Sequence, residues 1–155
     1  MFVLIVGAGR VGSAVAKKAL AAGHEVSVLD EDPLSHERLD AGQDRSWEDA
    51  GGRFTVGTAL ETEALIQAGI ERADAFIAST AGDNTNLVIA QIAQRRFGVE
   101  KAIVRVMDPA RADWYGDQGL QTISPTKHAI EMFEQALTSE PRGAQHALSA
   151  NGEAR

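Results

Sequence analysis

The sequence predicts an α/β fold in which helices cover both faces of a doubly wound parallel sheet. Short aliphatic runs, typical of strands buried on both faces, alternate with longer segments whose apolar residues recur at helical spacing. The first run ends in three glycines at G-x-G-x-x-G spacing, Gly7, Gly9 and Gly12. Strands that alternate with helices form a parallel sheet with helices on both sides. The predicted architecture is therefore a Rossmann-like, six-stranded sheet followed by a C-terminal helix.

The expected strands are short apolar runs bounded by turn or polar residues. The first, FVLIV, is a continuous aliphatic run, and EVSVL, RFTV, AFIA, AIVRV and QTI follow it along the chain. In chain order the strands are expected at residues 2–6, 25–29, 53–56, 75–78, 102–106 and 121–123.

Between these runs the apolar residues recur at helical spacing, which predicts the helices. The first helix begins near Val11, behind the glycines, and two later helices stop where Gly69 and Gly98 can end them. In chain order the helices are expected from residue 11, over 34–39, 61–68, 86–97 and 109–115, and over 126–137. Residues 139–155 carry Leu148 as their only large aliphatic side chain. Residues 1–138 are therefore expected to form one domain and residues 139–155 a polar, disordered tail.

Composition excludes several classes of function. Fifteen Lys and Arg against twenty-two Asp and Glu give a net charge of −7, which argues against nucleic-acid binding. The chain has no cysteine, so it offers no disulfide and no thiol nucleophile, as is usual in the cytoplasm. The apolar N-terminal run is too short for a signal sequence or a membrane span. We therefore expect a soluble protein without direct membrane insertion, whose membrane role, if any, passes through a partner.

The glycine turn has a specific chemistry in this context. Gly7 makes the turn, Gly9 lets the backbone approach a pyrophosphate, and Gly12 lets the helix pack closely on the strand. The N–H groups at the helix start, around Arg10 and Val11, lie at the positive end of the helix dipole and can hold phosphates. The Arg10 guanidinium either reaches a terminal phosphate or is a solvated residue. The alternative is a glycine turn that binds nothing.

An acidic run at the end of the second strand complements this turn. Asp30 follows Gly7 by the roughly 20 residues at which a dinucleotide fold places the carboxylate that binds the ribose hydroxyls. Glu31 and Asp32 come next, and these negative charges repel a 2′-phosphate. The run predicts a site for NAD or another adenine nucleotide rather than NADP. The alternative is a solvated acidic turn.

Further candidates follow the third and fourth strands, because ligands of open α/β sheets bind at the carboxyl ends of the strands. The small residues Gly57, Thr58 and Ala59 leave room for an adenine ring. Thr80, which follows the fourth strand, is a further candidate for contact with the bound ligand. Asp83 and Asn84 either contact the ligand or cap the following helix.

One arginine interrupts a strand that reads as buried. Arg105 lies within AIVRV, and a buried arginine needs an anionic partner. Asp108 is the simplest partner, and we expect this pair to be structural.

By these motifs the chain resembles the RCK or KTN domain, the TrkA-N-type nucleotide-binding domain of potassium-uptake regulators. The resemblance rests on the glycine turn at residues 6–20, VLDEDP at 28–33, the long stretch at 57–87, and VRVMDP with ISPT at 104–109 and 123–126. It covers residues 1–138. The family usually has an aspartate where this chain has Thr58, and many members continue into a ligand-sensing subdomain where this chain has its polar tail.

The resemblance implies a cytoplasmic regulatory subunit, peripheral to the inner face of the membrane. Members bind NAD or NADH, ATP, ADP or AMP, and the bound state gates a membrane potassium channel or transporter. Two other readings are a small NAD-dependent oxidoreductase and a nucleotide sensor for a different partner. The residues argue against an enzyme, because no Tyr-x-x-x-Lys pair occurs and none of the histidines has the paired carboxylate or metal-ligand spacing that catalysis requires.

The expected C-terminal helix carries more apolar surface than one docking stripe needs. Ile130, Phe133 and Leu137 form one stripe at helical spacing, and a second stripe of Ala129, Met132 and Ala136 lies beside it. One reading is that the helix covers the edge of its own sheet. The resemblance implies instead that it packs on a second subunit, in a homodimer or a higher ring.

Overall fold

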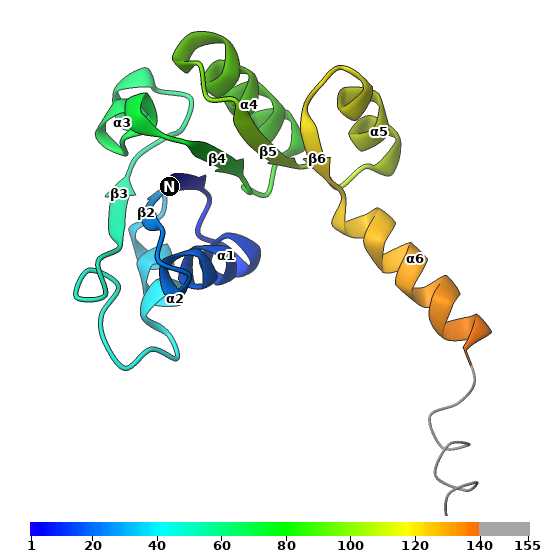
Figure 1. Cartoon of the computed structure of the whole chain (residues 1–155), viewed down its shortest axis with the longest axis horizontal. Coiled ribbons are helices and arrows are strands. Elements are labelled where there is room, and N and C mark those ends of the chain that lie inside the picture. Colours follow the sequence, from blue (N-terminus) through cyan, green and yellow to red (C-terminus); the bar gives the residue numbers. More distant parts are fainter. Residues whose placement is uncertain (140–155) are drawn as a thin grey trace, which may run out of the picture.

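The computed structural model describes residues 1–139 and confirms the predicted fold (Figure 1). Six parallel strands form one sheet in the order β3-β2-β1-β4-β5-β6. The strands are β1 (Phe2–Val6), β2 (Glu25–Asp30), β3 (Arg53–Val56), β4 (Ala75–Ala78), β5 (Lys101–Arg105) and β6 (Gln121–Ile123).

The helices begin and end close to the predicted positions. They are α1 (Arg10–Ala21), α2 (Glu37–Asp40), α3 (Thr62–Gln67), α4 (Asp83–Phe97), α5 (Pro109–Asp117) and α6 (Pro125–Thr138), with 3₁₀ turns η1 (Pro33–His36) and η2 (Ile70–Arg72). The short helix expected over 34–39 is divided between η1 and α2, and α4 begins three residues earlier than expected, with the N–H of Asn86 bonded to the carbonyl of Gly82.

The residues of β1 alternate between two cores, so helices cover both faces of the sheet. Leu4 packs with residues of α3, α4 and α5, whereas Ile5 packs with residues of α1 and α2. The second core includes Trp47, which is 1% exposed and donates its indole N–H to the carbonyl of Arg53. This tryptophan holds the long β2–β3 connection against the sheet.

The strand order reverses direction between β1 and β4. From β1 the chain proceeds outward through β2 and β3, and it then returns to pair β4 with the other side of β1. In open α/β sheets such a switch point opens a crevice at the carboxyl ends of the strands. The turns after β1 and β4, which carry Gly7 and Ser79, therefore border the expected binding position.

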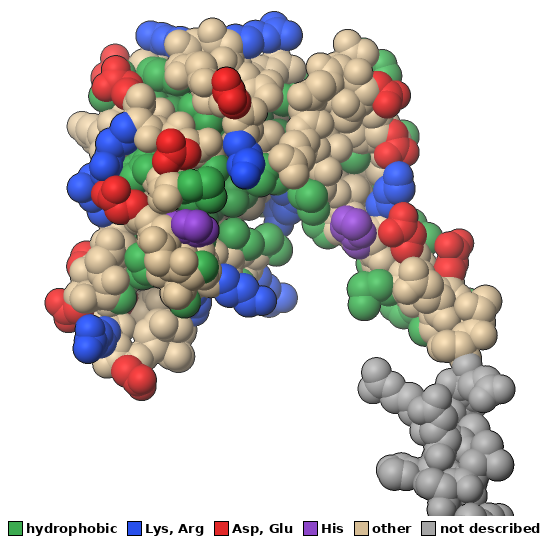
Figure 2. Space-filling view, viewed as in Figure 1, with side chains coloured by type: hydrophobic (Ala, Val, Ile, Leu, Met, Phe, Trp, Pro, Cys, Tyr) green, Lys and Arg blue, Asp and Glu red, His purple; other side chains and the backbone are tan. Residues whose placement is uncertain are grey.

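The C-terminal helix α6 projects away from the sheet (Figure 1). None of its residues is buried, and Phe133 and Leu137 are 73% and 86% exposed. Figure 2 shows the uncovered hydrophobic side chains on this helix. The reading in which α6 covers its own sheet edge is therefore wrong, because β6 carries only three residues and α6 leaves the sheet directly after it.

Within residues 1–139, no helix combines the length and the apolarity that crossing a bilayer requires. The predicted tail lies outside the described residues, apart from Ser139 at the C-cap of α6.

Candidate functional site

A cleft of about 250 Å³ lies at the carboxyl ends of the central strands. It brings together seven of the predicted site residues, Gly7, Asp30, Glu31, Gly57, Thr58, Ala59 and Thr80. Its other lining residues, which the sequence did not single out as ligands, are Val6, Leu29, Leu60, Ala81, Gly82 and Thr85. The predicted residues Gly9, Arg10, Val11, Gly12 and Asn84 do not line it.

Each of the three glycines is required, or tolerated, for a different steric reason. Gly7 has φ +97°, and a Cβ there would lie 2.9 Å from the backbone of Ser79 and Thr80. A Cβ on Gly12 would lie 1.8 Å from the carbonyl oxygen of Gly7, so α1 packs against the turn only because position 12 has no side chain. A Cβ on Gly9 would meet nothing within 4 Å. The backbone at Gly9 therefore faces open space that a ligand can occupy.

The N-terminus of α1 follows this open space directly. Gly9 is its N-cap, no side chain among the described residues caps the helix, and its first turn holds no acidic residue. Within residues 1–139, the N–H groups of Arg10 and Val11 have no hydrogen-bond partner, and both residues are exposed. A helix start with unpaired N–H groups is a site that favours a phosphate.

Asp30 lines the cleft and also holds the glycine turn. Its Oδ2 accepts a hydrogen bond from the N–H of Ala8 across 2.6 Å, and its Oδ1 accepts one from the N–H of Asp32 across 2.9 Å. A carboxylate has about four acceptor positions, so both oxygens can still accept from ribose hydroxyls. The sequence predicted the ribose contact and missed this second role.

Small and apolar residues form the remainder of the cleft. Gly57 packs against α3, where a Cβ would lie 2.9 Å from that of Ala64. Thr58 and Ala59 follow it, and the side chain of Leu60 is 57% exposed. Together with the buried Leu29 they form an apolar wall beside Asp30, which suits the face of an aromatic ring.

A buried asparagine fixes the loop after β4. Asn86 is 0% exposed, and its Oδ1 accepts from the backbone N–H and the hydroxyl of Thr80, at 2.9 and 2.7 Å. Its Nδ2 donates to the carbonyls of Thr80 and Arg105, both at 3.0 Å. All four bonds of this amide are made, so Thr80 is held in one position on the cleft wall. A polar residue within the apolar face of a helix was the signal that could have found it.

Comparison with known proteins assigns this domain to a family. The model of the TrkA-N domain matches residues 3–125 of the chain. The chain belongs to the TrkA-N domain family. The predicted resemblance to RCK domains is thereby confirmed.

A Trk system potassium uptake protein TrkA from Streptomyces coelicolor is 38% identical over 145 residues. The match covers 94% of this chain and 61% of that protein, so the chain spans less than two thirds of its length.

Two solved structures share the fold of the TrkA-N domain. A Kef C-terminal domain from Shewanella denitrificans in an AMP-bound form has a TM-score of 0.70 and 22% identity, and the match covers 95% of this chain and 88% of that one. The GsuK channel bound to NAD has a TM-score of 0.70 and 21% identity, over 88% of this chain and 23% of that one.

Three polar residues of this TrkA-N domain lie differently from the sequence prediction. Neither Asp83 nor Asn84 caps α4: the carboxylate of Asp83 accepts from the N–H groups of Met107 and Asp108, and Asn84 accepts from Arg111 across 2.7 Å. Arg105 makes no ion pair with Asp108 within the described chain. It donates to the carbonyl of Thr80, while Asp108 caps α5.

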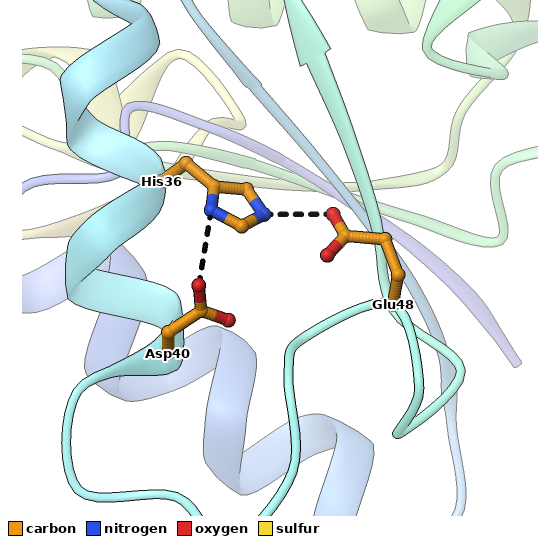
Figure 3. Close-up of side chains that lie close together, drawn as sticks. All are labelled: His36, Asp40 and Glu48. Atoms are coloured by element: carbon orange, nitrogen blue, oxygen red, sulfur yellow. Dashed lines mark hydrogen bonds and ion pairs between the residues drawn. The ribbon is translucent and has the colours of Figure 1, made fainter.

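The prediction that no histidine of this TrkA-N domain has a paired carboxylate is wrong for His36 (Figure 3). Its Nδ1 lies 3.3 Å from Asp40 and its Nε2 lies 2.8 Å from Glu48. The two carboxylates meet opposite nitrogens of one ring, so each ring nitrogen has its own carboxylate partner. Asp40 also accepts from the N–H of Trp47, so the group closes the β2–β3 connection away from the cleft.

Proposed function

We propose that this domain binds an adenine nucleotide with an unphosphorylated ribose, namely NAD or NADH, or else ATP, ADP or AMP. The observation that carries the proposal is that the carboxylate of Asp30, which lines the cleft, also holds the glycine turn that leads directly into the uncapped start of α1. The N–H groups at residues 10–12 would hold the phosphates, and Arg10 would add its charge to a terminal phosphate. Asp30 would accept from the ribose hydroxyls.

The adenine would lie against the wall formed by Leu29, Thr58, Ala59 and Leu60. An aspartate at position 58 would be a charged hydrogen-bond acceptor for the ring, and threonine offers only a hydroxyl. The presence of AMP in the Kef domain and of NAD in GsuK supports this ligand class. Calorimetric titration with NAD, NADH, NADP, ATP, ADP and AMP tests it directly.

The proposed role is binding rather than catalysis. Among the residues that line the cleft, the ionisable ones are Asp30 and Glu31, and no histidine, lysine or tyrosine stands among them. A hydride transfer to a carbonyl needs a proton donor next to the nicotinamide, and these two carboxylates lie at the ribose end. Absence of turnover with NADH and small carbonyl substrates is the expected result.

The bound nucleotide would act as a signal to a membrane potassium transporter or channel. The similarity to TrkA of Streptomyces coelicolor and the fold shared with the GsuK channel support this role. The domain would then work in the cytoplasm, held at the inner face of the membrane by its partner. Co-purification of the tagged chain with a multi-span potassium transporter tests the assignment, and recovery with a membrane protein of another class would contradict it.

The uncovered face of α6 would pack on a second copy of the chain. Ile130, Met132, Phe133 and Leu137 expose 50–86% of their surface, and no residue of the helix is buried. A two-fold axis would place this face against the same face of the second copy, so that both faces become buried. Light scattering tests whether the chain is a dimer or a larger ring.

A further inference from the structure

The first turn of α4 connects the cleft to the root of α6. Gly82 lines the cleft, and Asp83 follows it at the first position of the helix. Instead of capping its own helix, the Asp83 carboxylate crosses to the segment after β5. Its Oδ1 lies 2.8 Å from the N–H nitrogen of Met107, and its Oδ2 lies 3.2 Å from that of Asp108. A carboxylate bonded to two adjacent N–H groups is a charge-assisted, directional contact.

The same segment holds the start of α6 on its other side. The N–H of Val106 donates to the carbonyl of Ile123 across 2.9 Å, and the hydroxyl of Ser124 donates to the carbonyl of Met107 across 3.4 Å. Ser124 is 5% exposed, and its hydroxyl also caps α6 by accepting from the N–H of Lys127. Residues 106–108 therefore lie between the start of α4 and the start of α6, bonded to both.

A second connection runs parallel to the first through α5. Arg111 donates to Asn84, and Asp113 pairs with Lys127 of α6 at 2.9 Å. These side chains are exposed, and exposed pairs of this kind hold weakly. The Asp83 connection is more rigid, because a half-buried carboxylate contacts backbone rather than long side chains.

We infer that Asp83 is the positioning residue through which a ligand in the cleft sets the orientation of α6. The inference rests on the proposed nucleotide binding. Thr80 and Gly82 line the cleft and belong to the loop that leads into α4, so a ligand that fills the cleft would contact this loop, and Asp83 would move with it. Met107 and Asp108 are bonded to Asp83 and would move with it. The end of β6 and Ser124 are bonded to residues 106–107, so they would be displaced as well.

The test measures the orientation of α6 and the affinity separately. The chain has no cysteine, so Lys18→Cys on α1 and Gln135→Cys on α6 place spin labels at two exposed positions only. The distance between the labels is measured with and without AMP, ADP and NAD, in labelled chain diluted with unlabelled chain. Calorimetry gives the affinity of the same samples. The variants are Asp83→Ala and Asp83→Asn, and Asp117→Asn on α5 is the matched control, because Asp117 makes no side-chain bond among residues 1–139.

We expect the ligand to change the distance in the parent and in Asp117→Asn. In Asp83→Ala the change should be lost while the affinity stays within about threefold, since Asp83 does not line the cleft. A purely structural Asp83 would lower the melting temperature and leave the distance change intact, which overturns the inference. Nucleotide binding by the parent without any distance change overturns it too, but leaves the proposed binding function standing.

If no adenine nucleotide binds the parent, the proposed function fails and the inference fails with it. Should Asp83→Ala not fold by circular dichroism, Asp83→Asn and Ser124→Ala decide the question. Asp83→Asn removes the charge and keeps one acceptor oxygen. Ser124→Ala removes the hydroxyl that bonds to Met107 and so breaks the connection at its α6 end. Retention of the full distance change in both variants contradicts the inference.

Discussion

The carboxylate of Asp30 accepts a hydrogen bond from the backbone N–H of Ala8, with 2.6 Å between Oδ2 and the nitrogen. One side chain at the end of β2 thus fixes the turn after β1 and lines the cleft beside it. The shape of the turn depends on this group, and the proposed recognition of the ribose would depend on it as well, so a variant at this position should change both.

Replacing Asp30 by alanine should weaken adenine-nucleotide binding by roughly tenfold to a hundredfold, because a lost charge-assisted hydrogen bond costs about 1.5–3 kcal/mol. The free energy of unfolding should also fall, since the N–H of Ala8 loses its acceptor. Asp30→Asn keeps one acceptor oxygen, so the free energy of unfolding should fall by less than the free energy of nucleotide binding. Calorimetry and thermal unfolding measure the two effects, and unchanged affinity in Asp30→Ala would remove the ribose contact from the proposal.

Gly9 and Gly12 should separate binding from folding. In Gly9→Val the side chain enters open space, so the domain should fold normally and lose most of its nucleotide affinity. In Gly12→Val the Cβ would overlap the carbonyl of Gly7, so the domain should be destabilised or fail to fold. Circular dichroism and calorimetry on both variants check this. Normal binding by a folded Gly9→Val chain would mean that the turn is only structural.

The acidic end of β2 should set the preference among nucleotides. At a ligand concentration about 100 times Kd, binding adds about 2.7 kcal/mol to stability, which for a domain of this size raises Tm by roughly 5–10 °C. We expect this shift with at least one of NAD, NADH, ATP, ADP or AMP, and a clearly smaller one with NADP. Glu31→Gln should narrow the difference, since it removes one exposed negative charge from the cleft. A larger shift with NADP in the parent chain would contradict the argument.

The exposed face of α6 should determine the oligomeric state. Phe133 is 73% exposed in the isolated chain, and glutamate at this position would place an unpaired charge in a subunit interface. Phe133→Glu should therefore give a smaller species by light scattering at tens of micromolar. Gln135→Glu adds the same charge outside the apolar stripes and should leave the assembly intact. A parent chain that is already monomeric under these conditions contradicts the dimer.

The ion pair between Asp113 and Lys127 should contribute to stability only below strongly alkaline pH. The hydrogen bond and the charge of Asp113 raise the pKa of Lys127 above its ordinary value of 10.5. A raised pKa means that the contribution is complete below pH 10.5 and is lost as the pH rises through the pKa of the folded state. The Tm of Asp113→Asn should thus lie slightly below that of the parent at pH 8 and converge with it at higher pH. If the Tm difference between the parent and Asp113→Asn persists after Lys127 has lost its proton, the ion pair is not the cause of that difference.

The strands could be predicted well because their signal is local. The residues predicted for β1, β3, β4 and β6 match the observed bounds, Phe2–Val6, Arg53–Val56, Ala75–Ala78 and Gln121–Ile123. Each is a short apolar run whose pattern is interrupted on both sides. The cleft followed from the same information, since the carboxyl ends of neighbouring parallel strands meet.

The partners of polar side chains could not be predicted in this way. Asp83 reads as a helix cap from its neighbours, yet its partners lie 24 and 25 residues away and become adjacent only because β5 pairs with β4. His36 reads as an isolated histidine, and its second carboxylate, Glu48, is brought to it by the packing of Trp47. Such contacts depend on tertiary structure, and propensities carry no information about them.

The attachment of α6 at one end has a mechanical consequence. The helix has 14 residues and is therefore about 21 Å long. A rotation of about 10° at Ser124 would move its far end by about 4 Å, whereas atoms 5 Å from the pivot would move by less than about 1 Å. A displacement of less than about 1 Å close to Ser124 would therefore become a movement of several ångströms at the distal apolar side chains of α6.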